Sequence, residues 1–419
     1  MALARANVLV CSTLTDTSES YMELNSMRNT ILLNIQLDDM NLLYDAYKAS
    51  MRDSSWKGEP QRFEADFLSE LTAISNELAL RTYKTSKGSE FVLNERGKTR
   101  FIHGNRMRDR VVRHCLCDNV LTPSLAPYLI YNNGASQKGK GTDFARRVFE
   151  TDMHNFYLEH KNNNGYVAFV DFSKFFDNIE HEKALELICP KLDEQAQWLL
   201  QVIFDNFKID VSYMTDDEYA SCINNKFNSI EYHKNISESM MLGEKFMRKS
   251  VDIGDQVSQD VGVFYPTIID NYATIVRGCN RYGRYMDDIY IIHESKDFLL
   301  SVIAGIKEQA NELGLFVNEK KTRIVRLSDN FKYLQFKYTL LDNGRVMKRI
   351  NPKTITRERR KLKSYKRLLD KGALNISDID NIYKSWMGNY ARYMSKVQRN
   401  NIKSLYEQLF ERSPRWKAQ

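Results

Sequence analysis

The chain has 419 residues and a formal net charge of +7 at pH 7, with 61 Lys and Arg against 54 Asp and Glu. A chain this long buries a large core and normally divides into two or three subdomains, and its many aromatic residues and few Gly and Pro exclude an extensively disordered protein. The moderate basic excess favours a polyanionic partner, and the lack of a membrane-length apolar run excludes a membrane-spanning helix.

The cellular compartment is predicted from cysteine use and from the first residues. The six cysteines are scattered without a Cys-x-x-Cys pair, which is typical of reduced thiols in a cytosolic protein. The apolar stretch Val8–Cys11 is too short and too weakly charged for a good signal peptide. We therefore expect a cytoplasmic protein that has no membrane partner.

Residues 1–90 are predicted to form a helical N-terminal extension. Apolar residues recur there at helix-compatible spacing, among them Leu32, Leu33, Phe63 and Phe67. The extension either binds RNA or a protein partner, or it packs against the subdomain that follows, and the pattern leaves both alternatives open.

The next stretch combines a hairpin, a helix and a loop. Asn94–Ile102 is predicted to form two strands around a Gly turn, and a helix is predicted to begin near Arg106. Residues 131–142 are rich in Gly and Asn, so we expect a loop there. This loop partly fits the Gly-x4-Gly-Lys phosphate-loop pattern. Gly141, however, stands where a magnesium-binding hydroxyl is required, which excludes a nucleoside triphosphatase of that class.

Two segments that are far apart in the sequence end in acidic residues. In residues 284–292, Asp287 and Asp288 lie between aromatic and β-branched residues, which predicts a β-hairpin with the acids at its tip. In residues 166–177, an apolar strand ends at Asp171. Hard divalent cations prefer oxygen ligands, so two strands that each deliver acid at one end can build a two-metal site for phosphoryl chemistry.

Residues 208–249 are predicted to form an insertion whose role the sequence does not indicate. Asp216–Glu218 within it is interpreted as a capped helix start rather than as an acidic site. Asp177, which follows the Asp171 strand, is interpreted as a helix cap. An apolar core helix is predicted for Val261–Val276.

Residues 354–410 are predicted to be helical, and they begin with a dense basic cluster. Leu362, Tyr365, Leu368 and Leu369 give that segment an apolar face at helical spacing. A basic amphipathic helix of this kind binds nucleic acid or lies on a membrane surface.

The order of the motifs resembles the palm domain of the prokaryotic reverse transcriptases, over about residues 98–393. The resemblance is carried by Asp171 and Phe176, Ile253-Gly254 with Ser258-Gln259, Tyr285-Met286-Asp287-Asp288, and Gly314-Leu315 with Asn318, Lys321 and Thr322. The form Ile-Gly-x3-Ser-Gln resembles the enzymes of diversity-generating retroelements and of phage defence. The resemblance also makes nucleic acid, rather than a membrane, the expected partner of the basic C-terminal helix.

The resemblance implies an α+β fold, namely a right-hand polymerase with fingers and palm of antiparallel sheet plus helices and an α-helical thumb. The implied domains are the extension (1–90), the fingers (91–165), the palm (166–340, with the insertion at about 208–249) and the thumb (341–419). No RNase H, endonuclease or maturase-like extension is expected.

The implied activity is RNA-directed DNA polymerisation by two-metal nucleotidyl transfer. Asp171, Asp287 and Asp288, with the backbone carbonyl of Phe172, are the implied ligands of two Mg²⁺ ions, with Mn²⁺ as an alternative. Lys321 matches the lysine near the leaving pyrophosphate, where it would act as a general acid or neutralise charge. Its neighbour Lys320 is the rival for that role.

The same resemblance implies how the nucleotide and the nucleic acid are bound. The triphosphate meets Lys98 and Arg100, and the ring of Phe176 acts as a steric gate against a 2′-hydroxyl, while Phe175 belongs to the core. Ile253 replaces an amide that is common in the family, so high fidelity is not expected. The implied nucleotide contacts also include Phe172 and Gln259, and the implied nucleic-acid contacts are Arg106, Arg110, Lys138, Lys140, Leu334, Gln335, Arg359, Arg360 and Lys363.

The expected partners are an RNA template, a DNA primer or product, and deoxynucleotides. A structured non-coding RNA is the favoured template, and an accessory protein or a second copy of the chain is left open. The favoured setting is antiphage defence with a cognate non-coding RNA. The alternatives are a diversity-generating retroelement and a self-primed, non-templated DNA polymerase.

Overall fold

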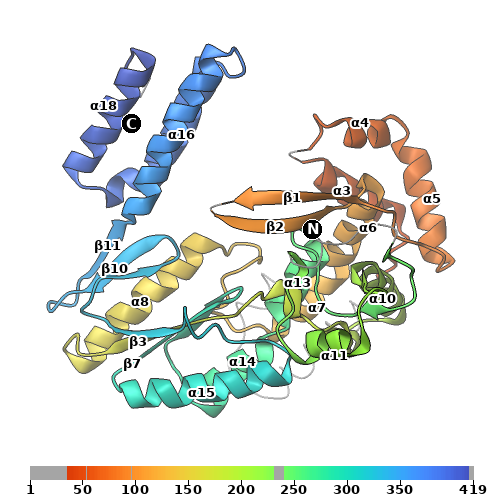
Figure 1. The fold of residues 1–419 in the computed structure, drawn as a ribbon, viewed down its shortest axis with the longest axis horizontal. Helices are drawn as coiled ribbons and strands as arrows, with labels where there is room; N and C mark the ends of the chain where they lie inside the picture. Colours follow the sequence, from red (N-terminus) through yellow and green to blue (C-terminus); the bar gives the residue numbers. More distant parts are fainter. Residues whose placement is uncertain (1–34, 53, 96, 231–239, 415–419) are drawn as a thin grey trace, which may run out of the picture. The chain divides into compact units, whose positions relative to one another are not determined.

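The computed structural model describes residues 35–52, 54–95, 97–230 and 240–414 (Figure 1). These residues form two units, each assembled from three separate stretches of the chain. The first unit comprises the residues up to Tyr131, Phe172–Tyr272 and Ile306–Val317, and the second comprises Asn132–Asp171, Ala273–Gly305 and the residues from Asn318 on. The division into extension, fingers, palm and thumb stays a prediction.

The first unit is mostly helical. Its helices are α3 (Met40–Met51), α4 (Gly58–Ala65), α5 (Phe67–Ala79), α6 (Met107–Leu116), α7 (Thr122–Leu125), α9 (His181–Ile188), α10 (Glu194–Phe207), α11 (Asp216–Asn224), α13 (Gln256–Phe264) and α14 (Thr267–Asn271). Two antiparallel strand pairs accompany them. These are β1 (Ser89–Glu95) with β2 (Lys98–Gly104), and β4 (Ile209–Asp210) with β5 (Phe246–Met247).

The N-terminal helices form because their apolar residues share one face. Leu43 of α3 and Leu71 of α5 are fully buried, and Tyr47 stacks on Phe67 with ring centroids 5.2 Å apart. Helix formation is therefore confirmed for the described part of the predicted extension. Residues 1–34, which include Leu32 and Leu33, lie outside the described residues.

Two predictions about helix ends are wrong. The helix predicted for Val261–Val276 is interrupted at Pro266, which has no N–H to continue the hydrogen-bond ladder, so α13 and α14 are separate and a π-helical turn follows. Asp177 is not a helix cap, because it lies inside the 3₁₀ turn Phe176–Asn178 and its carboxylate accepts hydrogen bonds from Ser229.

The described part of the insertion has a small core of its own. Thr215 caps α11 through a reciprocal capping box with Glu218, which confirms the interpretation of that acidic stretch. Val211, Phe227 and Met247 are buried together beneath β4 and β5. Residues 231–239 of the insertion lie outside the described residues.

The second unit is built on a four-stranded antiparallel sheet, with strand order β6-β7-β3-β8. β3 lies between two neighbours, and Val167–Val170 is buried throughout, as expected of a central strand. Helix α8 packs on β6 and β7, and its Phe149 meets Tyr290 edge-to-face at 4.8 Å (Figure 1). The elements are α8 (Thr142–His160), β3 (Tyr166–Asp171), β6 (Tyr282–Tyr285), β7 (Asp288–His293) and β8 (Arg323–Arg326).

The C-terminal part of this unit adds a second sheet and three helices. The sheet has the order β11-β10-β9 and is antiparallel. The helices enclose a core that includes Leu362, Tyr383 and Tyr406, which confirms the predicted helical pattern. The elements are β9 (Phe331–Tyr333), β10 (Phe336–Leu340), β11 (Val346–Ile350), α16 (Pro352–Asp370), α17 (Ile376–Tyr390) and α18 (Lys396–Phe410), while α15 (Lys296–Glu312) contributes residues to both units.

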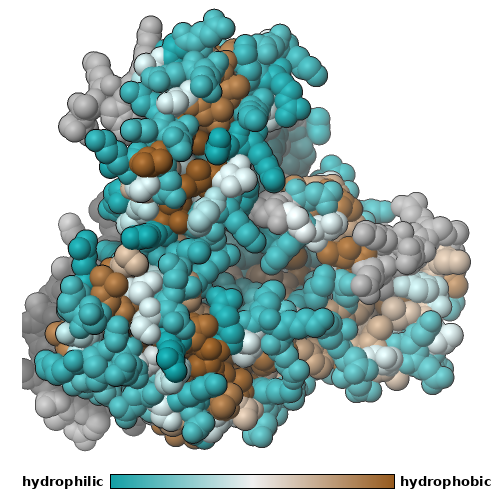
Figure 2. Space-filling view, turned by 60° about the vertical axis from the view of Figure 1, so that its left-hand side comes forward, coloured by the Kyte–Doolittle hydropathy of each residue, from teal (hydrophilic) through white to brown (hydrophobic). Residues whose placement is uncertain are grey.

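The surface is largely hydrophilic on the face drawn in Figure 2, where apolar side chains form smaller patches between polar ones. None of the described helices combines the length and the apolar character that crossing a membrane requires.

Candidate active site

Three acidic residues lie at or beside the ends of two paired strands of the second unit. In the antiparallel pair of β3 and β7, Asp171 is the register partner of Asp288. Tyr285 pairs with Asp288 in the β6–β7 hairpin, so Met286 and Asp287 form the turn. Residues directly opposite each other in an antiparallel pair share a face of the sheet. The backbone thus brings Asp171 and Asp288 to one face, and the predicted hairpin is confirmed.

A buried arginine supports the turn that carries the acids. Met286 has φ of 56°, a left-handed conformation that is costly for a residue with a side chain. The guanidinium of Arg284 is fully buried and donates to the Met286 carbonyl oxygen over 3.1 Å. The backbone of Arg284 also bonds to Asn132 and Gly134. Sequence reasoning missed this role, although a charged residue inside an apolar strand was a usable signal.

Lys321 contacts the first acid directly. Its Nζ lies 2.5 Å from Oδ1 of Asp171, whose side chain is 15% exposed. The loop that carries the lysine is anchored to β3, because the Asn318 N–H donates to the Asp171 carbonyl over 2.7 Å and the Lys321 N–H donates to the Asn318 carbonyl. The structure therefore brings Lys321, rather than its exposed neighbour Lys320, to the carboxylate of Asp171.

The charge of Asp288 acts on residues of β9. Burial lowers the pKa of Lys332, and the nearby Asp288 carboxylate opposes that shift. Burial raises the pKa of Tyr333 well above its usual value, and Asp288 adds to the increase. Burial is the larger cause of both shifts, and the contribution of Asp288 to each shows that its carboxylate lies near this strand.

The donor chemistry of the site fits a hard divalent cation. Carboxylate oxygens are the ligands that such ions prefer, and the ammonium of Lys321 on Asp171 shows that this carboxylate accepts a positive charge. In the described ranges of the chain, however, no three His, Cys, Asp or Glu side chains gather as ligands of one ion. The structure places Asp171 and Asp288 as register partners. These two acids, Asp287 and the Phe172 carbonyl all stay predicted ligands.

The predicted triphosphate residues lie on the first unit's hairpin. Lys98 begins β2 and is exposed, and Arg100 is half-buried opposite Leu93 of β1. The predicted hairpin around a Gly turn is confirmed, with Gly97 at φ of 75°.

Ile253 lies in the turn before α13 and Gln259 lies within that helix, in the same unit. Ile253 lines a cavity of about 310 Å³, together with Phe101, His103 and Asp252. Gln259 is half-buried within α13. Their assignment to nucleotide binding stays a prediction.

The three phenylalanines after Asp171 differ in burial. Phe172 and Phe175 are 2% and 4% exposed, whereas Phe176 is half-buried and meets Phe175 edge-to-face at 5.3 Å. The expectation that Phe175 belongs to the core is confirmed. Phe176 keeps part of its ring accessible, as a steric gate requires.

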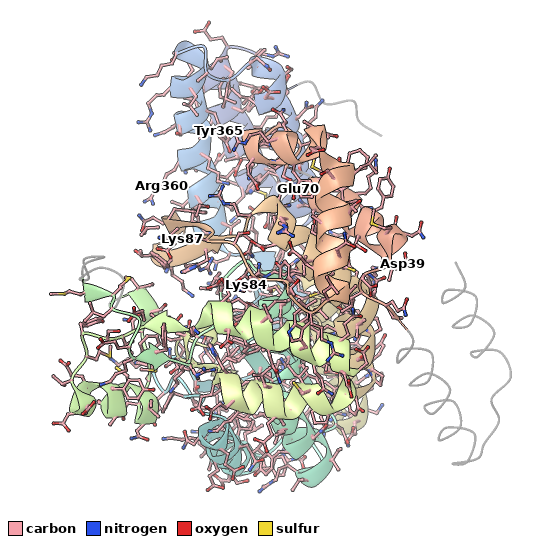
Figure 3. All side chains as sticks on the ribbon, turned by 90° about the vertical axis from the view of Figure 1, so that its right-hand side faces the viewer. Asp39, Glu70, Lys84, Lys87, Arg360 and Tyr365 are labelled. Atoms are coloured by element: carbon pink, nitrogen blue, oxygen red, sulfur yellow. The ribbon has the colours of Figure 1, made fainter. Side chains whose placement is uncertain are left out.

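The basic residues assigned to nucleic acid fall into two groups. Arg110 is engaged within the protein, where it donates to Ser54 Oγ over 3.3 Å and to the Ser50 carbonyl, and burial lowers its pKa. Arg106 donates to the Lys87 carbonyl over 3.2 Å. Lys140 lies 5.2 Å from the ring centroid of Phe144. The second group is exposed and consists of Lys138, Arg359, Arg360 and Lys363, of which Arg360 is labelled on α16 in Figure 3.

Leu334 and Gln335, two of the implied nucleic-acid contacts, lie in a hairpin between β9 and β10. They form its turn with φ of 36° and 75°. The Leu334 carbonyl accepts from Arg146 over 3.1 Å, and Gln335 Oε1 accepts from Tyr390 over 3.3 Å. These bonds hold a turn that the side chains alone would disfavour.

Two solved telomerase structures are similar to this chain. One is apo telomerase from Candida tropicalis, with 14% sequence identity and a TM-score of 0.40. The alignment covers 65% of this chain and 53% of the telomerase chain. The other is telomerase from Candida albicans in complex with a TWJ fragment of telomeric RNA, with 11% sequence identity and a TM-score of 0.40. The alignment covers 80% of this chain and 60% of the telomerase chain. The chain thus spans less than two thirds of either telomerase chain. No curated protein matches it.

The family is shown by a sequence match. The family model described as reverse transcriptase (RNA-dependent DNA polymerase) matches residues 86–338, more than half of the chain. The matched stretch includes the β1–β2 hairpin, the β3 strand that ends at Asp171, and the turn that carries Asp287 and Asp288. The chain belongs to the reverse transcriptase (RNA-dependent DNA polymerase) family, and its helices and antiparallel sheets have the α+β fold of the right-hand polymerases.

Proposed function

We propose that the protein copies a structured non-coding RNA into DNA, with the acids of β3 and the β6–β7 turn as its catalytic centre. The register pairing of Asp171 with Asp288 is the observation that carries this assignment. Asp171, Asp287, Asp288 and the Phe172 carbonyl would hold two Mg²⁺ ions, with Mn²⁺ as an alternative. Bound ions would activate the primer hydroxyl and stabilise the charge that develops on the departing pyrophosphate.

The chain's own side chains complete the reaction. The primer hydroxyl releases its proton to solvent, its oxygen forms a bond to the α-phosphorus, and the bond to the bridging oxygen of the pyrophosphate breaks. The ammonium of Lys321, held on Asp171 before substrate binds, donates a proton to that leaving oxygen or neutralises its charge. Lys98 and Arg100 pair with the triphosphate, and the Phe176 ring closes against a 2′-hydroxyl.

Primer extension on an RNA template tests the centre. Asp288→Ala and Asp287→Ala should each lower the rate of DNA synthesis by at least about 100-fold, because even the outer partners of metal ligands contribute about 10–100-fold. RNA binding and the melting temperature should be retained. The control is Asp329→Ala, since Asp329 is an exposed acid of the same unit. Synthesis at the parental rate in the Asp287/Asp288 double variant would place catalysis elsewhere.

The favoured setting is antiphage defence with a cognate RNA, and it is supported by the insertion at about residues 208–249 and by the moderate basic excess of the chain. The Ile-Gly-x3-Ser-Gln form instead favours a diversity-generating retroelement. A self-primed polymerase that needs no template is the third candidate.

Sequencing of the nucleic acid that copurifies with the full chain separates these settings. We expect one discrete structured RNA together with complementary DNA. DNA attached covalently to the protein and lacking a complement would instead establish self-priming. Copies of a variable protein-coding repeat would indicate the retroelement. Fractionation of the source cells tests the proposed cytoplasmic location, which recovery in the membrane fraction would contradict.

A further inference from the structure

The turn between Asp171 and Phe176 contains a strained residue whose carbonyl is held in place. Lys174 has φ of 49°, which side-chain-bearing residues rarely adopt. Its carbonyl oxygen accepts a hydrogen bond from Asn178 Nδ2 over 2.8 Å. The Ser173 N–H donates to the Phe316 carbonyl over 2.7 Å. These two hydrogen bonds, together with the one that the Val251 N–H donates to the Phe176 carbonyl, hold the path of the chain into Phe176.

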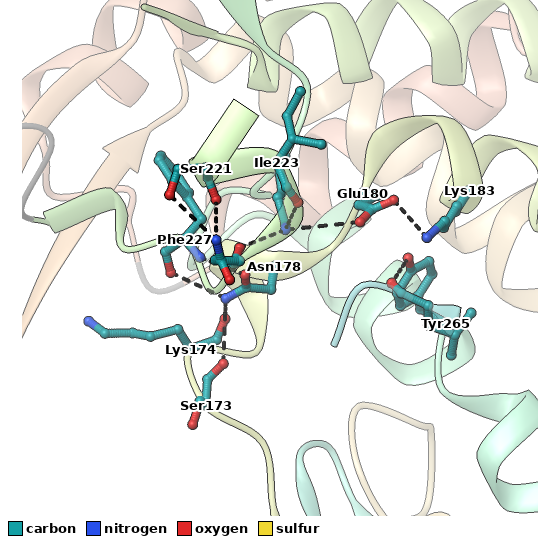
Figure 4. Close-up of polar contacts among 12 residues, drawn as sticks. Ser173, Lys174, Asn178, Glu180, Lys183, Ser221, Ile223, Phe227 and Tyr265 are labelled. Carbon is teal, nitrogen blue, oxygen red and sulfur yellow. Dashed lines mark hydrogen bonds and ion pairs between the residues drawn. The ribbon is translucent and has the colours of Figure 1, made fainter. Parts of the chain in front are cut away.

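Asn178 also bonds to the insertion, as Figure 4 shows. Its side chain is fully buried, its Oδ1 accepts from the Phe227 N–H over 2.8 Å, and its Nδ2 donates to the Phe227 carbonyl over 3.2 Å. The preceding residue, Asp177, accepts from Ser229 Oγ over 3.0 Å. Residues on both the turn and the insertion thus share one buried amide.

The insertion is anchored well enough to act as a support. The ammonium of Lys249, 2% exposed, donates to the carbonyls of Ile223 and Asn225 over 3.0 and 3.2 Å. It lies 3.9 Å from Glu180 Oε1, on the segment that follows the turn. Phe227 itself belongs to the insertion's small core. A segment that is packed at its core and hydrogen-bonded at its edge is rigid, so it fixes the position of the residues that bond to it.

We propose that the described part of the insertion, residues 208–230 and 240–249, sets the position of the Phe176 ring, and that Asn178 is the positioning residue through which it acts. This inference rests on the proposed role of Phe176 as the gate for the nucleotide sugar. An amide suits the task because it donates and accepts at once, so one side chain satisfies Lys174 and Phe227 together. Loosening that link lets the ring move, and a 2′-hydroxyl is then excluded less well.

The test compares kcat/KM for deoxynucleotides with kcat/KM for ribonucleotides in primer extension by the full chain. Asn178→Asp keeps the volume and the acceptor of the side chain but removes the hydrogen bonds that Nδ2 donates to the carbonyls of Ser173, Lys174 and Phe227. It should lower the ratio about tenfold, as expected for a small change in pocket fit. Phe176→Ala should lower the ratio in the same direction. Combining the two changes should add little to Phe176→Ala alone, because both act through one ring.

Thr215→Ala is the matched control, since it removes the cap of α11 within the same insertion but leaves the turn untouched. It should lower the melting temperature with the ratio unchanged. Ser229→Ala, which removes the hydroxyl bonded to Asp177, provides a second route if the Asn178 variant does not fold.

The outcomes separate this inference from the proposed function. A parental ratio in both folded variants, Asn178→Asp and Ser229→Ala, overturns it. An equal loss in Thr215→Ala also overturns it, because general destabilisation then suffices. If Phe176→Ala keeps the parental ratio of the two kcat/KM values, Phe176 is not a steric gate, and this inference fails with that role. If the parent protein makes no DNA at all, it is the proposed function that fails.

Discussion

Single buried polar residues determine local geometry in this protein. Arg113 and Asp255 form an ion pair with Nε and Oδ2 2.7 Å apart, and both side chains are almost completely buried. Asp255 also caps α13 and accepts a hydrogen bond from Asn105 over 2.6 Å. A buried carboxylate with several partners orients its neighbours, whereas one without partners destabilises the fold.

Asp252 is the contrasting case. Its Oδ2 is buried without a hydrogen-bond partner, and the nearest cationic candidate, His103 Nδ1, lies 3.9 Å from Oδ1. Burial, reinforced by the negative charge of Asp255, raises the pKa of Asp252 to about 8. The side chain is therefore protonated at neutral pH.

The raised pKa predicts how stability depends on pH. Between the unfolded pKa of about 4 and the folded value, the folded state keeps a proton that the unfolded state releases, so stability falls as pH rises through this window. Asp252→Asn removes the titration, and it should stabilise the protein by about 1–3 kcal/mol at pH 8, with a much smaller gain near pH 4.5. Melting curves at both pH values measure the difference. A gain that does not vary with pH, or one that the exposed Asp329→Asn variant shares, would contradict this account.

At the scale of elements, α16 shows how one helix combines a core face and a binding face. Leu362 is buried, and Tyr365 and Leu369 pack against the same core, while the basic residues of the helix lie outside it. Asn351 caps the helix through the Lys353 N–H, and Pro352 occupies its first turn, where a missing N–H does no harm. Figure 3 labels Tyr365 on this helix.

The exposed basic face of α16 should bind the template–primer duplex. Replacing Arg359, Arg360 and Lys363 together by Ala should raise the Kd at least about tenfold and reduce the slope of log K against log salt by about 1 for each lost phosphate contact. Fluorescence anisotropy at several salt concentrations measures both quantities. The matched control is the triple Ala variant of Lys396, Arg399 and Lys403, which are exposed residues of α18. Equal weakening by the two triple variants would indicate a general charge effect instead.

At the scale of the whole molecule, sequence order and spatial order differ. Each unit collects three stretches of chain, and the central strand β3 pairs with β7 and β8, which both come much later in the sequence. The juxtaposition of the proposed catalytic acids Asp171 and Asp288 is therefore a product of long-range pairing, even though each acid lies in a short local motif. The same holds for Lys321, which reaches Asp171 because its loop is bonded to the end of β3.

The sequence by itself determined the element types, the hairpin that carries Asp287 and Asp288, the amphipathic C-terminal helices and the family. These features depend on local sequence patterns, such as the alternation of apolar and polar residues, helical spacing and the order of motifs. Such patterns can be recognised without knowledge of the tertiary structure. The helix break at Pro266 could also be predicted from the sequence, and the prediction of one continuous helix overlooked that proline.

The tertiary structure alone decided which buried polar groups meet. The register that sets Asp171 opposite Asp288, the bond from Arg284 to the Met286 carbonyl, and the amide of Asn178 shared between Lys174 and Phe227 each join partners brought together by the folded backbone. A hydrogen bond needs its two atoms within about 3 Å and well aligned. No spacing along the chain encodes that condition, because it is met only when separate elements have packed.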